Sequence, residues 1–445
     1  LSQLAADQPV VLAPKTSSYQ RWADALANYR QLPTVQAERA YWQQVVSEPV
    51  NELPVTPGIE DQRYQHTETL TVSLDSEMTR ALLQEANQCY HTQINDLLLT
   101  ALLQVVRDWV GGDGIRLDLE GHGREALFDD IDLHSTVGWF TTLFPVHLRQ
   151  TAGDMGEQIK RVKEQLRTIP HNGIGYGLLA DEQADQPSAE ILFNYLGQFD
   201  QTTTQTEGLA WSFDNVGECV SDQLSRRYVL SINSEVSQGQ LQVVFDYHQQ
   251  QLTSSTVQQL ATAYRQALEA IIGHCLQARG GYTASDFPLA TLSQAQLDSL
   301  MVQYPTMVEL FASTPMQQGM IFHSQLAAAS GVYMTQLQMR LSQLDPERFK
   351  RSWQQLASHH PVFRTAFISQ PEGDVLQLVQ AAVTLPWTTH DWQHLSDAAQ
   401  QQTLADLLVE ERATPFDFAQ PPLMRLVLIQ LSADQYQFIW THHHA

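Results

Sequence analysis

The most informative segment of this 445-residue chain reads Ile115-Arg116-Leu117-Asp118-Leu119-Glu120-Gly121-His122-Gly123-Arg124-Glu125. Apolar residues occupy every second position of its first half, which predicts a β-strand with one apolar and one polar face. Gly121 and Gly123 end that strand, and glycines let a backbone turn tightly and approach a ligand closely. Glu120 closes the strand, at a place where a rigid scaffold can hold a general acid or base. A surface ion pair between Glu120 and Arg124 is the alternative interpretation.

A long amphipathic helix is predicted directly before this strand, and Gly111-Gly112 ends it. Its apolar stripe comprises Ile94, Leu97, Leu98, Ala101, Leu102, Val105, Val106 and Trp109. Such a stripe must pack against a large apolar surface. Helix and strand together form an α/β unit, and Glu120 lies at the carboxyl end of the strand, where open α/β sheets bind ligands.

The composition is that of a globular protein, with 43% hydrophobic and 17% charged residues. The net charge of −24 provides no basic excess, so we expect neither nucleic acid nor an anionic membrane surface as a partner. The three cysteines, Cys89, Cys219 and Cys275, lack metal-ligand spacing, which predicts reduced thiols and no metal site. No apolar run approaches the roughly 20 residues of a membrane span, and residues 1–20 do not resemble a secretory signal, so we expect a cytoplasmic protein.

A second strand carries polar residues in an apolar context. Residues 191–199 read ILFNYLGQF, a mostly apolar strand interrupted by Asn194 and Tyr195. A buried amide or phenol without a partner is costly, so both side chains are expected to form hydrogen bonds, either within the protein or with a substrate.

Two segments between these strands are less specific. Pro170–Gly177 contains three alternate glycines, so its backbone is expected to pass close to another group, but it lacks the strand-to-helix context of a dinucleotide-binding fingerprint. Residues 136–145 are rich in aromatic side chains, and core packing is the simplest interpretation of Trp139 and Phe140 taken singly.

The best domain boundary is Gly280-Gly281 with the polar run that follows it to Ser293. A second pattern of strands and helices then begins near residue 307, and its last strand leads into His442-His443-His444. A purification tag would usually be longer than this histidine run, so we interpret the run as the continuation of a strand.

With these segments in order, the chain resembles the epimerization and condensation domains of nonribosomal peptide synthetases. The first half carries segments similar to four successive epimerization-domain motifs: Asp118–Glu125, Val137–Phe140, Pro170–Gly177 and Phe193–Gln198. The second half carries segments similar to the start of a condensation domain: Ser313–Met320, His360–Phe367 and His443-His444, the opening of an HHxxxDG motif.

The resemblance implies a fold of class α/β (α+β), with two chloramphenicol-acetyltransferase-like lobes joined by a linker. We expect residues 1–280 to be the C-terminal part of an epimerization domain, lacking its HHxxxDG motif. Residues 281–306 would be the linker, and residues 307–445 the N-terminal lobe of a condensation domain that stops inside HHxxxDG. Each part would be half of a V-shaped domain in which the motif histidines face a tunnel between two lobes.

The resemblance also implies L-to-D epimerization of an aminoacyl or peptidyl thioester held on the phosphopantetheine arm of a peptidyl carrier protein. Condensation with the next aminoacyl thioester would follow. Glu120 would be one of two proton carriers, and the second histidine of the absent motif the other. Asn194 and Tyr195 would orient the thioester or stabilise the enolate oxygen. His444 would position or deprotonate the acceptor amine.

The remaining residues have expected roles by the same resemblance. His443 would act beside His444, while Gly175, Tyr176 and Trp139 would contact the substrate. Two arginines, Arg124 and Arg364, would brace the structure. No directly bound cofactor is expected, and the expected partners are carrier protein domains and the remaining synthetase modules.

Three alternatives remain open. The two half-domains could dock a carrier protein without catalysis, because an acid without its base partner loses the arrangement that makes it useful. The two lobes could instead close on each other, with Glu120 and His444 facing one tunnel. A coenzyme A-dependent acyltransferase shares the fold and the histidine motif, but it does not explain the Glu120 motif or the tandem lobes.

Overall fold

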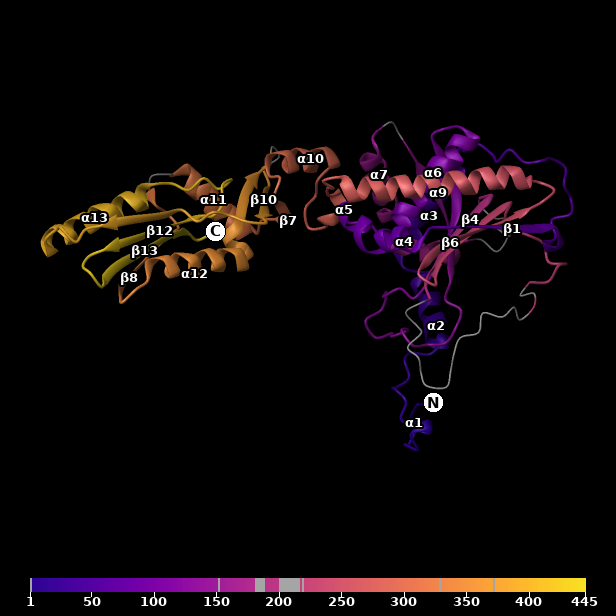
Figure 1. Cartoon of the computed structure of the whole chain (residues 1–445), viewed down its shortest axis with the longest axis horizontal. Coiled ribbons are helices and arrows are strands. Elements are labelled where there is room, and N and C mark those ends of the chain that lie inside the picture. Colours follow the sequence, from indigo (N-terminus) through magenta and orange to yellow (C-terminus); the bar gives the residue numbers. More distant parts are fainter. Residues whose placement is uncertain are drawn as a thin grey trace. The chain divides into compact units, whose positions relative to one another are not determined.

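The computed structural model describes residues 2–150, 153–180, 189–199, 217, 220–327, 330–370 and 373–445. Its contacts divide the chain into two units, Leu1–Tyr282 and Thr283–Ala445, and both contain helices and β-sheet (Figure 1). The expected mixed α/β class is therefore confirmed, while Cys219 lies outside the described residues. Within the described ranges, no helix combines the length and apolar character that a bilayer crossing requires.

The first unit is built on one six-stranded sheet. In spatial order its strands are β1 (Thr67–Ser73), β6 (Gln240–His248), β5 (Leu230–Ser237), β4 (Ile191–Gln198), β2 (Gly114–Gly121) and β3 (Thr142–Arg149). β2 pairs parallel with β4 and antiparallel with the edge strand β3. Because parallel strands run in the same direction, the carboxyl ends of β2 and β4 lie at the same edge of the sheet. The strands that carry Glu120 and Asn194 are therefore neighbours in the sheet.

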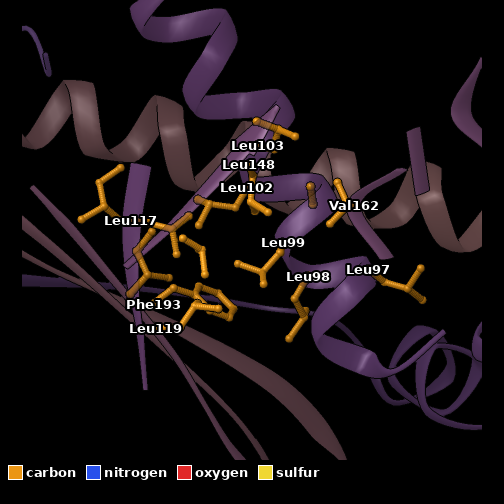
Figure 2. Packing of buried hydrophobic residues seen from close by; sticks show 14 of the residues in the cluster. Leu97, Leu98, Leu99, Leu102, Leu103, Leu117, Leu119, Leu148, Val162 and Phe193 are labelled. Atoms are coloured by element: carbon orange, nitrogen blue, oxygen red, sulfur yellow. The ribbon is translucent and has the colours of Figure 1, made fainter. Parts of the chain in front are cut away.

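A helical layer packs against the apolar face of β2. Helix α6 (Ile94–Val110) contacts both β2 and helix α9 (Ser254–Gln277), and Figure 2 shows the α6 leucines near apolar residues of the strands. The buried set includes Leu97, Leu98, Leu99, Leu102 and Leu103 of α6 with Leu117, Leu119, Leu148 and Phe193 of the sheet. Each fully buried leucine contributes about 1.5–3 kcal/mol to the free energy of folding. A one-residue shift in the register of β2 would expose Leu117 and Leu119 and would therefore be strongly destabilising. This packing fixes Glu120 on the opposite face of β2.

Local signals define several other helices of the first unit. These helices are α1 (Ser2–Ala5), α2 (Tyr19–Tyr29), α3 (Pro33–Ser47), α4 (Ser76–Ala81), α5 (Asn87–Cys89), α7 (Met155–Arg167) and α8 (Ile174–Leu179). Helix α7 begins after Asp154, whose carboxylate accepts the backbone N–H of Glu157 at 2.9 Å. Helix α6 ends at Gly111, which adopts a positive φ of 77°, as the glycine pair predicts. Strand β3 was not predicted, because the aromatic-rich segment 136–145 was interpreted only as core.

The second unit contains two sheets among its described residues. The three-stranded sheet has the order β7 (Met307–Ala312), β10 (Val375–Gln380), β9 (Thr365–Ser369). The four-stranded sheet has the order β11 (Trp387–Asp391), β12 (Met424–Gln430), β13 (Gln435–His443), β8 (Met334–Ser342). Its helices include α10 (Gln294–Gln303), α11 (Pro315–Leu326), α12 (Pro346–His359) and α13 (Asp397–Ala413). Residues 283–306, which the sequence assigned to a linker, group with this unit, and β13 extends through His443.

Candidate functional site

Glu120 and Asn194 meet at the carboxyl ends of two adjacent strands. Leu119 of β2 pairs with Phe193 of β4, and both side chains are buried in the core. Side chains alternate along a strand, so the next residue of each strand, Glu120 and Asn194, lies on the other face. There the Asn194 Nδ2 donates a hydrogen bond to Glu120 Oε2 at 2.8 Å. The second carboxylate oxygen, Oε1, has no hydrogen-bond partner among the described residues.

Partial burial raises the pKa of Glu120 above its ordinary value. Water is partly excluded from this carboxylate, and one amide donor compensates only part of the lost hydration. A carboxyl group with a raised pKa exchanges a proton more readily near neutral pH than an exposed one. The site therefore holds a carboxylate that has one oxygen tethered and one oxygen available.

Deeper on the same face of β2 lies a second carboxylate. Asp118 is 3% exposed, and its Oδ2 accepts a hydrogen bond from the Tyr228 hydroxyl at 2.9 Å. Burial, and then the nearby Asp118, raise the pKa of Tyr228 far above its ordinary value, so the phenol remains a donor. The sequence predicted a polar face for β2 but gave no sign that Asp118 would be buried with a tyrosine 110 residues away.

The turn after Glu120 is held by Arg124. Its guanidinium lies 4.0 Å from the centre of the Phe140 ring and donates a hydrogen bond to the Leu133 carbonyl. Gly123 has a φ of 65°, and a Cβ there would lie 1.7 Å from the Phe140 carbonyl oxygen, so glycine is required. No ion pair joins Glu120 to Arg124 in the part of the chain that the structure describes, and the surface-pair interpretation is not supported. The expected bracing position of Arg124 fits these contacts.

The structure does not bring Tyr195 to Glu120. Tyr195 follows Asn194 in β4, so strand alternation places it on the core face, where it packs against the hydrophobic cluster. Burial raises the pKa of the Tyr195 hydroxyl, and a hydrogen bond with Gln198 partly opposes this rise. The Asn194 amide and the Tyr195 phenol were expected to act together, but the period of two in a strand places neighbouring side chains on opposite faces.

The other residues expected to contact the substrate have neighbours other than Glu120. Gly175 faces Glu38, and Tyr176 packs edge-on against Trp42 with ring centres 5.3 Å apart. Trp139 is 82% exposed, so the core interpretation is wrong for this residue and right for the neighbouring buried Phe140. The Trp139 carbonyl accepts a hydrogen bond from the Tyr19 hydroxyl at 2.9 Å, which anchors the backbone while the indole faces solvent.

The second unit places the histidine run beside a cavity of about 280 Å³. His443 is buried, and its Nδ1 accepts the backbone N–H of Ala445 at 3.1 Å, which leaves Nε2–H to donate to Ser324 Oγ at 2.9 Å. Burial, and then the neighbouring His444 and His442, lower the pKa of His443 to about 4. His444 is exposed at the end of the strand and also lines the cavity. His443 is thus a neutral imidazole held in place by hydrogen bonds, and its neighbour His444 is accessible to solvent.

Arg364 lies in contact with the backbone of the same unit. Its Nη1 donates to the carbonyl oxygens of Gln380 and Ala381, which ties the turn before β9 to the end of β10. These contacts fit the bracing role expected for this arginine. Among the described residues, no three histidine, cysteine or acidic side chains form a group that could hold a metal ion.

Sequence reasoning missed three polar residues that the fold brings to these sites: Glu38, Tyr228 and Ser324. Glu38 lies in helix α3, where a charged residue among alanines and glutamines is usually exposed. The only local sign was its four-residue spacing from Trp42, whose Nε1 donates to Glu38 Oε2 at 3.1 Å.

Comparisons with known proteins place the chain among similar sequences and folds. The family model for the condensation domain matches residues 2–286 and 309–445. A linear gramicidin synthase protein from Brevibacillus parabrevis is 39% identical over 463 residues, which cover 99% of this chain and 9% of that protein. Bacitracin synthase 1 from Bacillus licheniformis is 32% identical, over 98% of this chain and 8% of that protein. The chain thus spans less than a tenth of the length of these relatives.

One solved structure is similar in both sequence and fold. It is the crystal structure of the epimerization domain from the third module of tyrocidine synthetase B. The identity is 36% and the TM-score 0.57, over 62% of this chain and 64% of that one.

Proposed function

The chain belongs to the condensation-domain family of nonribosomal peptide synthetases, and on that premise we propose that its first unit serves in epimerization of a thioester substrate. The substrate would be an aminoacyl or peptidyl group on the phosphopantetheine arm of a peptidyl carrier protein, converted from L to D in the cytoplasm. The similarity to a solved epimerization domain supports this choice over simple condensation. The observation that carries it is the half-buried Glu120 with its Asn194 partner at the carboxyl ends of β2 and β4.

In the proposed mechanism Glu120 moves the α-proton. Its Oε2 is held by the Asn194 amide, so the unpartnered Oε1 takes the proton from the α-carbon, and the electron pair moves into the thioester to form an enolate. Inversion then requires a proton from the opposite face. By family resemblance that proton comes from the second histidine of the HHxxxDG motif of the same domain's other lobe. The raised pKa of Glu120 brings its proton affinity closer to neutral pH, where such a transfer is most efficient.

The second unit would provide the N-terminal lobe of the condensation domain that acts next. His444, exposed at the cavity, would position or deprotonate the acceptor amine, which then attacks the donor thioester. His443, buried and hydrogen-bonded to Ser324, would hold the strand end in place for it. Carrier protein domains and the neighbouring modules would deliver both substrates.

Exchange of Glu120 for glutamine in the intact parent synthetase tests the proposal. We expect α-deuterium wash-in from D₂O to fall about 10²–10⁴-fold, because glutamine keeps the Asn194 bond but cannot accept the α-proton. Thioester loading should remain intact. Glu190→Gln is the matched control, since this carboxylate is also half-buried with a pKa raised by burial, but it precedes β4 and binds the Leu53 N–H at 2.9 Å. An unchanged D-to-L ratio in Glu120→Gln would refute the assignment.

The non-catalytic alternative concerns the 445-residue chain by itself. The hydrogen-bond partner of Glu120 is an amide, whereas inversion needs proton carriers on both faces of the α-carbon. The chain alone should therefore bind an L-aminoacyl carrier protein without converting it to the D form. Conversion at the rate of the parent synthetase would show instead that the isolated chain is a complete catalyst.

A further inference from the structure

A buried carboxylate, Glu38 of helix α3, lies next to the glycine-rich segment of the first unit. Glu38 is 6% exposed, and it accepts hydrogen bonds from Trp42 Nε1 at 3.1 Å and from His171 Nδ1 at 2.8 Å. A Cβ on Gly175 would come within 2.0 Å of Glu38 Oε2, so the glycine lets the backbone of α8 pass directly over the carboxylate. A negative charge is thus enclosed by an indole, an imidazole and a backbone.

The residue that Glu38 holds begins an unusual turn. His171, Asn172 and Gly173 are three consecutive left-handed residues, with φ values of 43°, 52° and 83°. The left-handed region is unfavourable for histidine and needs external contacts to persist. The Glu38 bond to His171 is such a contact, and at Gly173 a Cβ would lie 2.1 Å from the Phe144 ring. Contacts with Glu38 and with Phe144 therefore hold the turn in this conformation.

This turn is connected to the residues that follow Glu120. Asn172 Nδ2 donates to Glu125 Oε2 at 2.7 Å, and Glu125 lies 3.5 Å from the exposed His122. The Asn172 carbonyl oxygen would lie 3.7 Å from a Cβ placed on Gly121, the residue directly after Glu120. A chain of contacts thus runs from Glu38 through the left-handed turn to the segment 121–125.

We propose that Glu38 is a positioning residue for Glu120, acting through the left-handed turn at 171–173 that seats the segment 121–125. This inference rests on the proposed role of Glu120 in proton transfer. Without the Glu38 bond, His171 relaxes toward an ordinary conformation and Asn172 withdraws from Glu125. The segment 121–125 then loosens, and Glu120 spends less time in its reactive position.

The kinetic signature follows from this mechanism. Glu38→Gln in the parent synthetase leaves one acceptor oxygen for two N–H donors, those of Trp42 and His171. It should lower kcat for α-deuterium wash-in about 10- to 100-fold, because a displacement near 1 Å is enough for such a loss. KM for the carrier-bound substrate should stay within about twofold, since Glu38 does not touch the substrate. Glu190→Gln should change neither quantity, although it also alters a half-buried, hydrogen-bonded carboxylate.

Hydrogen exchange on the 445-residue chain provides a readout independent of activity. Peptides covering 121–125 should exchange about tenfold faster in Glu38→Gln, whereas peptides within α6 should keep their protection. His171→Ala should give the same result, and because His171 is partly exposed this variant guards against a folding failure at Glu38. His171→Gly should restore much of the protection, since glycine adopts the left-handed conformation freely. In the His171→Gly background, Glu38→Gln should cause little further increase in the exchange rate at 121–125.

The outcomes test the positioning role of Glu38 and the proposed epimerization function separately. Faster exchange at 121–125 with a lower kcat supports the positioning role. Unchanged exchange in folded Glu38→Gln and His171→Ala chains overturns it, as does normal wash-in by Glu38→Gln. A wild-type synthetase without any wash-in would overturn the proposed function instead, and the exchange experiment would still show whether Glu38 seats the segment.

Discussion

Replacing Asn194 by leucine removes the amide that donates to Glu120 while keeping a side chain of similar volume. A hydrogen bond to an ionised group contributes about 1.5–3 kcal/mol when buried, and the lower end applies here because Glu120 is only partly buried. One pKa unit corresponds to about 1.4 kcal/mol. Since the bond stabilises the charged carboxylate, its loss raises the pKa of Glu120 further.

The assay is the pH dependence of α-deuterium wash-in by the intact synthetase. Activity requires ionised Glu120 and is lost as pH falls through its pKa, so the acidic limb should move upward by about one pH unit in Asn194→Leu. Ser234→Ala is the matched control, because the Ser234 hydroxyl donates to the Asn194 carbonyl at 3.0 Å and not to Glu120. An acidic limb that stays in place in Asn194→Leu would refute the assignment of Glu120 as the titrating group.

Two predictions concern stability. His443 is buried, and its pKa of about 4 lies below the unfolded value near 6.5. The free energy of unfolding of the second unit should therefore fall by up to about 3 kcal/mol between pH 6.5 and pH 4. Denaturant titrations at several pH values measure this change, and an equal fall in His443→Leu would contradict the prediction. Asp96 is buried and accepts two hydrogen bonds from Arg167, at 3.0 and 2.7 Å. Asp96→Ala should therefore lower the free energy of unfolding, measured by chemical denaturation, by about 3 kcal/mol. A decrease below about 1 kcal/mol would show that the pair is dispensable for stability.

The elements that sequence reasoning located well carry their own start and stop signals. The helix predicted directly before β2 is α6, and it ends at Gly111 as the glycine pair indicated, because a glycine stop is a local signal. Strand β3 was missed because segment 136–145 was interpreted only as aromatic core, and its Pro145 is unfavourable in a central strand. In the sheet Pro145 pairs with Asp118 from an edge strand, where a missing N–H is tolerated. Strand β11, parallel to β12, has little apolar alternation and was missed as well.

The site was only partly predictable for a related reason. Apolar alternation identified the strand of Glu120, and a mostly apolar run identified the strand of Asn194. The core packing sets the face on which both side chains lie. The burial of Glu38 depends on His171, 133 residues away, and such long-range contacts leave no local pattern. The hydrogen bond from Tyr19 that anchors the Trp139 carbonyl likewise joins residues 120 positions apart, which composition alone does not reveal.

The parallel pairing of β2 and β4 has a consequence for how the protein is made. Glu120 and Asn194 are 74 residues apart, and β3, α7 and α8 lie between them in the chain. During translation Glu120 leaves the ribosome long before its partner exists, and closing so long a connection is slow and entropically unfavourable. Until the crossover is complete, Glu120 is an ordinary hydrated carboxylate. A nascent or prematurely terminated polypeptide therefore lacks the assembled proton-transfer group.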